Sequence, residues 1–276
     1  MARVTVVSDT HLSPAAPEAL LSWDAVVDHV GSLRPDLVIH AGDVTLDGAN
    51  DPSELAAARD QLDRLAVPWL AVPGNHDTGD TPPTEGGRDV PIDADRRARW
   101  VDALGPDWWC ATTGGWTIVA LDGQLLGSGL DDEQLQWRWV EETVAGLDPT
   151  RPLLLVMHKP MATTAEERAE GSRRRFAPEP ATRRLDQLTV GHNLRAVLSG
   201  HVHQHRLAER GGVAQVWAPT TWAVLPDSHQ PLYGEKRCGV LSLSLEADGT
   251  FDVAAVEPDG LAQRVLGSDL VDPYHR

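Results

Sequence analysis

Aspartate, histidine and asparagine side chains follow five short apolar runs of the sequence, and each of these residue types can bind a metal ion. They stand in the segments Asp9-Thr10-His11, Gly42-Asp43, Gly74-Asn75-His76-Asp77, His158 and Gly200-His201-Val202-His203. Imidazole nitrogens together with carboxylate and amide oxygens suit borderline first-row transition metals. The Asp-x-His and His-x-His pairs place two donors on one side of an extended segment, and one aspartate can bridge two cations. The residue types therefore predict a two-metal hydrolytic centre.

These five segments can meet because each follows a predicted strand. In an open α/β sheet, the loops at the carboxyl ends of parallel strands converge on one crevice. Glycine stands directly before Asp43, Asn75 and His201, which fits turns in which the backbone approaches a ligand closely. One histidine or aspartate at a strand end is usually a cap or a satisfied polar group. Five such positions in succession favour a shared metal site.

The elements that must position these residues follow from the hydrophobic pattern. Apolar runs alternate with helical patterns as far as residue 199, which indicates parallel strands joined by crossover helices. Strands are predicted at 4–8, 37–39, 68–72, 116–121, 153–157 and 194–199. Helices are predicted at 17–33, 93–104, 132–147 and 181–190, and a further helix is predicted to begin after Asp51, its N-cap. Residues 78–90 are predicted to form a loop, and 163–176 a charged surface excursion.

After His205 the pattern changes to alternating strands at 213–217, 240–245 and 251–256, with Gly211-Gly212 and Asp248-Gly249 as hairpin signals. The prediction is an α/β fold in which two packed mixed β-sheets are flanked by helices. We expect one domain over residues 1–276. Residues 1–205 would carry the metal motifs, 206–258 would complete the second sheet, and 259–276 would form a C-terminal tail.

Composition limits the partners of the protein. Its 24 basic and 41 acidic residues give a net charge of −17, which repels nucleic-acid backbones and anionic membranes. Two cysteines make no disulfide framework and suit a reducing cytoplasm. The sequence has no apolar run near the ~20 residues of a membrane span, and it opens without a long apolar leader. We therefore expect a cytoplasmic protein that binds neither a membrane nor a nucleic-acid polymer.

In their order along residues 9 to 203, the five segments resemble the signature of the calcineurin-like metallophosphoesterases. The resemblance implies a four-layer αββα sandwich and two transition-metal ions, Mn²⁺ or Fe²⁺/Fe³⁺, with Zn²⁺ as a further option. It implies that one ion is held by Asp9, His11, Asp43 and His203, and the second by Asp43, Asn75, His158 and His201. It also implies that His76 is a catalytic residue that assists the leaving group, oriented by Asp77, and that Asn75 and His76 contact the substrate.

The implied reaction is hydrolysis of a small phosphate ester. A metal-bound water, its pKa lowered to ~7, would attack phosphorus as hydroxide while both cations neutralise the non-bridging oxygens. The opening Ser8-Asp9-Thr10-His11-Leu12 and the compact length are most similar to bacterial class III cyclic-nucleotide phosphodiesterases. The run from Asp43 to Gly48 lacks the basic residue of serine/threonine protein phosphatases. Leu46 stands where purple acid phosphatases carry a ligating tyrosine. The segments also resemble those of DNA-repair nucleases of the superfamily. Those nucleases normally have extra domains and basic surfaces, which 276 residues with a net charge of −17 do not offer.

Three functions stay open at this stage. The first is a phosphodiesterase, with 3′,5′-cyclic nucleotides as candidate substrates, and the second is a phosphomonoesterase or nucleotide phosphohydrolase with the same metal cage. The third, a non-catalytic scaffold, is disfavoured because every expected metal ligand and His76 are present. The oligomeric state, a homodimer included, also stays open.

Several further residues have two interpretations. Lys159 could touch a phosphate, but a solvated lysine is favoured. The run Arg173-Arg174-Arg175 could clamp an anion over the site, but a solvated surface run is favoured. Trp217 and Trp222 could stack on a nucleobase, but core packing is favoured.

Overall fold

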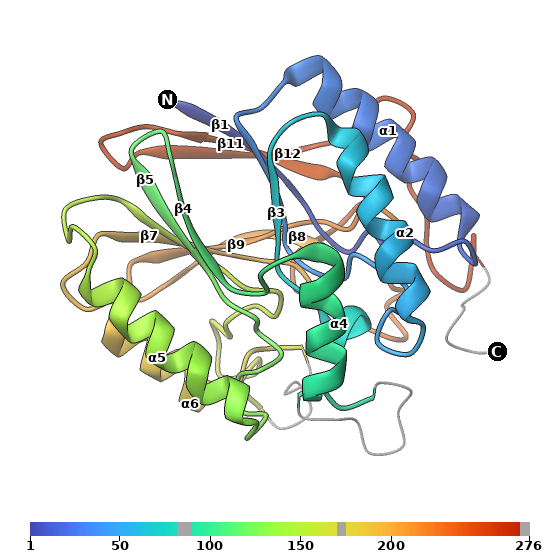
Figure 1. Cartoon of the computed structure of the whole chain (residues 1–276). Coiled ribbons are helices and arrows are strands. Elements are labelled where there is room, and N and C mark those ends of the chain that lie inside the picture. The colour runs from blue at the N-terminus through green and yellow to red at the C-terminus, as the bar shows by residue number, and fades with distance from the viewer. Residues whose placement is uncertain (82–89, 170–174, 271–276) are drawn as a thin grey trace.

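A computed structural model describes residues 1–81, 90–169 and 175–270 of the chain. Two β-sheets lie face to face, and helices cover the outer face of each, so that the molecule has four layers (Figure 1). The predicted fold class is confirmed. No helix among the described residues is long and apolar enough to cross a membrane.

The first sheet carries the N-terminal strands. Its order is β12-β11-β1-β2-β3, with β1, β2 and β3 parallel and β11 antiparallel to β1. The strands are β1 (Ala2–Val7), β2 (Leu37–His40), β3 (Trp69–Ala71), β11 (Val240–Leu245) and β12 (Phe251–Val256), and the covering helices are α1 (Pro17–Leu33), α2 (Pro52–Leu62) and α4 (Ala94–Leu104). A 3-10 turn, η1 (Asp63–Leu65), follows α2.

Local sequence explains where these helices begin. Asp51 caps α2 by accepting a hydrogen bond from the Ser53 amide at 3.0 Å, and Pro52 occupies the first helical position. Asp93 caps α4 in the same way, through the amide of Arg96 at 2.7 Å. Both caps satisfy backbone donors that have no partner within the helix.

The second sheet has seven strands in the order β10-β8-β9-β7-β6-β5-β4. The strands β5, β6, β7 and β9 run parallel to one another, and antiparallel strands lie at both sides. The strands are β4 (Trp109–Thr113), β5 (Trp116–Ala120), β6 (Leu153–Val156), β7 (Leu194–Ser199), β8 (Gln204–Arg210), β9 (Val213–Trp217) and β10 (Glu235–Lys236). The helices α5 (Asp131–Ala145) and α6 (Glu179–Leu188) cover its outer face (Figure 1).

The layer between the sheets is the main hydrophobic core. Alternate residues of β1, such as Val4 and Val6, pack there against Trp116, Ile118 and other side chains of the second sheet. The intervening residues of the parallel strands pack outward against the helices. Burial on both faces explains why these strands read as unbroken apolar runs in the sequence.

The C-terminal third differs from the prediction. Strands β8 to β10 join the second sheet, but β11 and β12 join the first, where β11 pairs with β1. Residues 206–258 therefore complete both sheets, not the second alone. The sequence pattern also missed β4 and β8, whose alternating polar residues resemble those of a loop. Part of the predicted loop at 78–90 and part of the excursion at 163–176 lie outside the described residues.

Lys159 is fully buried, so the expectation of a solvated lysine is wrong. Its ammonium pairs with the buried carboxylate of Asp80 and donates to the carbonyl of Thr81 at 2.9 Å. Asp80 in turn lies in the segment that pairs with Pro91. The ion pair thus ties the residue after His158 to the segment that leads out of α3 (Asn75–Thr78). It also removes Lys159 as a candidate for phosphate binding.

We expect Lys159→Met to lower the free energy of unfolding by about 3–5 kcal/mol, because the variant leaves Asp80 buried without its cation. Equilibrium urea denaturation, with the metal content of both proteins checked, measures this change. Arg64→Met is the matched control, because Arg64 pairs with Asp24 where both side chains are exposed. That variant should change the free energy by less than about 1 kcal/mol. Equal effects of the two substitutions would contradict the assigned burial.

Candidate metal centre

The predicted ligands lie on loops at the carboxyl ends of strands from both sheets. Asp9, Asp43 and Asn75 follow β1, β2 and β3 of the first sheet, whereas His158 and His201 follow β6 and β7 of the second. Parallel strands in each sheet bring these loops to one edge, and the face-to-face packing of the sheets brings the two edges together. The arrangement follows the prediction that the strand ends share a crevice.

The backbone of these loops is strained at the ligands themselves. Seven non-glycine residues in the described ranges have positive φ, and five of them are Asp9, His11, Asp43, His201 and His203, with φ between 48° and 71°. Side chains with a Cβ disfavour this left-handed region, and strain of this kind concentrates at functional sites. The fold therefore holds these five side chains in orientations that an ordinary strand end would not provide.

Glycines let the loops approach one another. A Cβ at Gly42 would lie 2.3 Å from Nδ1 of His158, and a Cβ at Gly74 would lie 2.1 Å from Oδ1 of Asp43. At Gly200 it would lie 1.8 Å from the hydroxyl of Ser8. Each distance is far below van der Waals contact. The glycines before Asp43, Asn75 and His201 are therefore required for close approach, as the sequence indicated.

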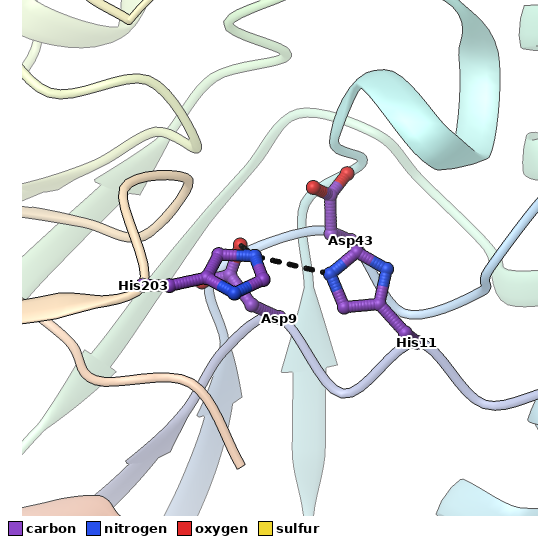
Figure 2. A group of neighbouring side chains, drawn as sticks. All are labelled: Asp9, His11, Asp43 and His203. Carbon is purple, nitrogen blue, oxygen red and sulfur yellow. Dashed lines mark hydrogen bonds and ion pairs between the residues drawn. The ribbon is translucent and has the colours of Figure 1, made fainter. Parts of the chain in front are cut away.

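One group of donors consists of Asp9, His11, Asp43 and His203 (Figure 2), which place one ligand atom each within 4.8 Å of one another. Nε2 of His11 lies 3.2 Å from Nε2 of His203, the contact that is dashed in Figure 2. Nε2 of His203 lies 3.4 Å from Oδ1 of Asp9. All four side chains are buried.

Asp43 also belongs to a second group, with His158 and His201. Its Oδ2 lies 3.2 Å from Nε2 of His158, and that nitrogen lies 3.2 Å from Nδ1 of His201. Asn75 is buried and lines the same cleft as Asp43 and His201. The shared carboxylate gives the arrangement of two adjoining cation sites with a common ligand.

The hydrogen bonds of the rings show that a cation fits this set. Nδ1 of His158 donates to the carbonyl of Ala41 at 2.8 Å, and Nδ1 of His203 donates to the carbonyl of Ala223 at 2.6 Å. In the neutral rings each Nε2 then presents a lone pair to the cluster. Nδ1 of His11 and Oδ1 of Asn75 are buried and have no hydrogen-bond partner among the described residues. Converging lone pairs repel one another unless a cation lies between them.

Burial and neighbouring charges displace the pKa values of these groups. Burial favours the neutral acid at Asp43, yet the imidazoles of His158 and His76 hold the pKa of this carboxyl well below its usual range. Burial opposes a charged imidazole at His158, but the Asp43 carboxylate raises the pKa of His158 to about 9. Burial, followed by the His76 imidazole, lowers the pKa of His11 well below its ordinary value. Asp43 is thus the anionic centre of the cluster, which suits a ligand shared by two cations.

His76 and Asp77 are held by different contacts. Nδ1 of His76 lies 2.7 Å from the carbonyl of Leu46, and the ring lines the cleft. The carboxylate of Asp77 accepts from the amides of Val44, Thr45 and Gly74 and from the Thr45 hydroxyl, at 2.7–3.1 Å. Asp77 therefore does not orient His76 directly. It fixes the backbone that follows Asp43, which leads to the Leu46 carbonyl that holds the His76 ring, and it ties this backbone to Gly74.

A segment that the sequence analysis did not identify supports the first donor group. The hydroxyl of Thr220 donates to the carbonyl of Asp9 at 2.8 Å, and the carbonyl of Ala223 holds His203. Between them, the indole of Trp222 packs on the ring of His11, with centroids 5.0 Å apart. Trp222 is 2% exposed and Trp217 is fully buried, so core packing of both is confirmed. Trp222 nevertheless positions a predicted ligand.

The donors open onto a cleft with a volume of about 190 Å³. We call its lining residues at the metal centre, Asp43, Asn75, His76, His201 and His203, the inner wall, and its other lining residues, Arg175, Leu225, His229, Gln230 and Leu266, the outer wall. Arg175 is thus at the site, whereas Arg173 and Arg174 lie outside the described residues. Leu266 comes from the predicted C-terminal tail, which packs back beside Val224. For Arg175 the arginine run was the signal, although the sequence favoured a solvated surface run. For Leu266 the sequence carried no signal, because its place depends on tertiary packing.

Comparison with known proteins identifies the family. The family model of the calcineurin-like phosphoesterases matches residues 2–205, and the chain belongs to this family. It is 26% identical over 235 residues to a probable cyclic nucleotide phosphodiesterase of Synechococcus sp., covering 82% of this chain and 78% of that protein. It is 27% identical to a probable glycerophosphodiester phosphodiesterase of Arcobacter nitrofigilis, covering 73% of this chain and 71% of that protein.

Solved structures agree on the fold. A purple acid phosphatase from yellow lupin superposes with a TM-score of 0.65 and 15% identity, over 97% of this chain and 54% of that one. A dimetal phosphatase from Danio rerio gives a TM-score of 0.58 and 15% identity, over 89% of this chain and 93% of that one. The chain is a metal-dependent phosphoester hydrolase by family, and its donor cluster is the candidate dinuclear centre.

We expect the purified protein to bind two transition-metal ions per chain and to lose activity on chelation, because six donor residues form two adjoining groups through Asp43 and Asn75 lines the same cleft. Elemental analysis after reconstitution with Mn²⁺ measures the stoichiometry. Asp43→Asn should reduce occupancy of both sites, whereas His11→Ala should affect one. A wild-type stoichiometry of one ion or none would contradict the arrangement.

His76 and its neighbour Asn75 should have separable roles. His76→Ala should retain both metals yet lose roughly 10²–10⁴-fold in kcat, the range for general acid–base assistance. Asn75→Ala should instead weaken one metal site, because its buried Oδ1 is directed to no other described group. Metal titration and turnover are measured on the same preparations. Loss of a metal from His76→Ala would show that His76 is a ligand.

Proposed function

We propose that this chain hydrolyses phosphodiesters, with 3′,5′-cyclic nucleotides among the candidate substrates. The observation that carries the proposal is the buried donor cluster around Asp43, which opens onto a cleft of small-molecule size. The probable phosphodiesterase names of the two bacterial relatives support a diester. The expected cofactors are two Mn²⁺ or Fe²⁺/Fe³⁺ ions, with Zn²⁺ as an alternative, because the donors are imidazole, carboxylate and amide groups.

Two cations held at the Asp43 cluster would act as Lewis acids on the phosphoryl oxygens and would lower the pKa of a bound water. The residues of the chain then have distinct tasks. Asp9, His11, Asp43 and His203 would hold one cation, and Asn75, His158 and His201 would complete the site of the other with Asp43. The second-layer contacts from Ala41 and Ala223 keep the rings of His158 and His203 in the tautomer that can coordinate.

His76 is the proposed acid for the departing alkoxide. Because Nδ1 of His76 donates to the Leu46 carbonyl, proton transfer by this ring runs through Nε2. The ring packs edge-on against His11, with centroids 4.7 Å apart, so it lies beside the first donor group and on the cleft wall. A proton delivered there would neutralise the negative charge that develops on the leaving oxygen.

A small substrate suits the cleft and the charge of the protein. The cleft volume of about 190 Å³ is well below the size needed to enclose a polymer, and the net charge of −17 opposes a polyanion. We propose a small phosphate ester as the partner and the cytoplasm as the location.

The alternative function is phosphomonoester hydrolysis, and one observation favours it. Arg175 lines the cleft, and a monoester carries close to two negative charges that an additional cation could match. Against it, Arg175 donates to the carbonyl of His229 on the outer wall, and no contact in the described ranges joins it to a metal-centre residue. The diester is therefore the primary proposal.

We expect kcat/KM for bis-p-nitrophenyl phosphate to exceed that for p-nitrophenyl phosphate by at least about tenfold, or ~1.4 kcal/mol of transition-state preference. The reason is that the inner wall offers metal ligands and His76 but no arginine. Both rates, and that for 3′,5′-cyclic AMP, are measured side by side with Mn²⁺. A monoester rate equal to or above the diester rate would favour the monoesterase alternative.

A further inference from the structure

Arg175 lies on the outer wall of the cleft and is anchored to the loop that carries two of the predicted ligands. The next residue, Phe176, is 3% exposed and packs on the rings of Trp217 and Tyr233, with centroids 5.8 and 5.6 Å away. The same hydrophobic cluster includes Val202, which stands between His201 and His203 in the sequence. The backbone of Arg175 is therefore fixed relative to the metal centre.

The guanidinium of Arg175 is hydrogen-bonded to a turn around His229 that several further hydrogen bonds stabilise. Its Nη2 donates to the carbonyl of His229 at 3.1 Å. The amides of His229 and Gln230 both donate to the carbonyl of Pro226. From the other side, the amide of Gln204 donates to Oε1 of Gln230 at 2.8 Å, and Lys236 donates to the Gln230 carbonyl at 2.9 Å. The acceptor that positions Arg175 thus has little freedom to move.

The charge of Arg175 is not neutralised by a carboxylate in the described part of the chain. Nearby arginines differ: Arg206 pairs with Glu167, and Arg210 pairs with Asp186. A guanidinium offers five N–H donors, and one of those of Arg175 is used in the bond to His229. In a protein of net charge −17, an arginine without an acidic partner on a cleft wall is suited to bind an anion.

That anion need not be the phosphate that is cleaved. Two cations at the Asp43 cluster would already exceed the single negative charge of a diester, and no contact in the described ranges joins Arg175 to a metal-centre residue. Leu225 and Leu266 give the outer wall an apolar portion, which suits the carbon skeleton of a substrate arm. The wall therefore combines an apolar surface with one unneutralised cation.

We propose that Arg175 is a specificity-determining residue that binds a second anionic group, a carboxylate or a phosphate, on one alcohol arm of the phosphodiester. This inference rests on the proposed phosphodiesterase function. It assigns to the cleft a substrate with two separate negative centres, one at the metals and one at the outer wall.

The test uses three diesters that share the p-nitrophenyl leaving group and differ in the other arm. The second arm is 4-carboxyphenyl, the neutral 4-carbamoylphenyl of nearly equal shape, or 4-(phosphonomethyl)phenyl, which distinguishes a phosphate-like group from a carboxylate. Values of kcat/KM are measured with Mn²⁺-loaded wild type, Arg175→Gln and Arg175→Lys. Arg151→Gln is the charge-matched control, because Arg151 is exposed and precedes β6, at the end of the strand opposite to His158.

Wild type should prefer at least one of the two anionic arms over the carbamoyl arm by about tenfold or more, as expected for a charge-assisted hydrogen bond. Arg175→Gln should abolish this preference while keeping the rate for the carbamoyl diester within about threefold of wild type. Arg175→Lys should retain part of the preference, and Arg151→Gln all of it. The thermal unfolding midpoint of each variant verifies folding.

Two results would overturn the inference. An equal loss of kcat/KM by Arg175→Gln on all three diesters would place Arg175 at the cleaved phosphate. Unchanged kinetics on all three would place its side chain in solvent. The proposed function fails separately, if wild type does not cleave even the neutral carbamoyl diester.

Discussion

Mutual repulsion among buried electron-donating atoms is the constraint on which the site depends. Nε2 of His203 lies 3.2 Å from Nε2 of His11, and Nε2 of His158 lies 3.2 Å from Nδ1 of His201. Packing such atoms together without water costs free energy unless a cation or a shared proton lies between them. The left-handed backbone at five of these residues adds strain. Both costs are understandable if the cluster binds cations whose attraction outweighs them.

The surrounding structure orients the donors through the backbone more than through other side chains. The carbonyls of Ala41, Leu46 and Ala223 each fix one imidazole by its Nδ1. Asp77 supports this arrangement by accepting hydrogen bonds from the amides of Val44 and Thr45, which follow Asp43. A main-chain carbonyl is a reliable acceptor because it cannot change rotamer or protonation state. The tautomers of the rings are thereby set by the fold.

Much of the architecture and of the donor set could be predicted because both are encoded locally. A buried parallel strand gives an apolar run, and the residue at its carboxyl end must lie at the shared edge, so Asp9, Asp43 and His158 could be placed together. Helix starts were readable from capping residues such as Asp51 and Asp93.

What could not be predicted depends on distant partners. The burial of Lys159 requires Asp80, far away in the sequence, and the support by Trp222 requires the chain to return beside β1. The contribution of Leu266 to the outer wall was equally hidden, because Leu266 reaches the cleft by pairing next to Val224. No periodic pattern reports such contacts. Asp77 contacts the backbone near Asp43 and not the His76 ring, because neighbours in a helical turn point their side chains in different directions.

The ligands of the metal centre come from both sheets, and this affects how the two sheets are held together. Hydrophobic packing between two sheets is non-directional and by itself tolerates small sliding movements. Each of the two predicted cations would draw ligands from both sheets: His203 reaches across to Asp9, and His158 to Asp43. Coordinate bonds are short and directional, so bound cations would fix the position of one sheet relative to the other at this edge. At the far edge Ala2 packs against Gly114 in the turn between β4 and β5, and two hydrogen bonds join the sheets: Trp116 donates to the carbonyl of Glu246 at 2.6 Å, and Arg195 to that of Gly249 at 3.1 Å. With cations bound, the two sheets would then be joined by directional bonds at both edges, and removing the cations would leave the edge at the metal centre as the less constrained one.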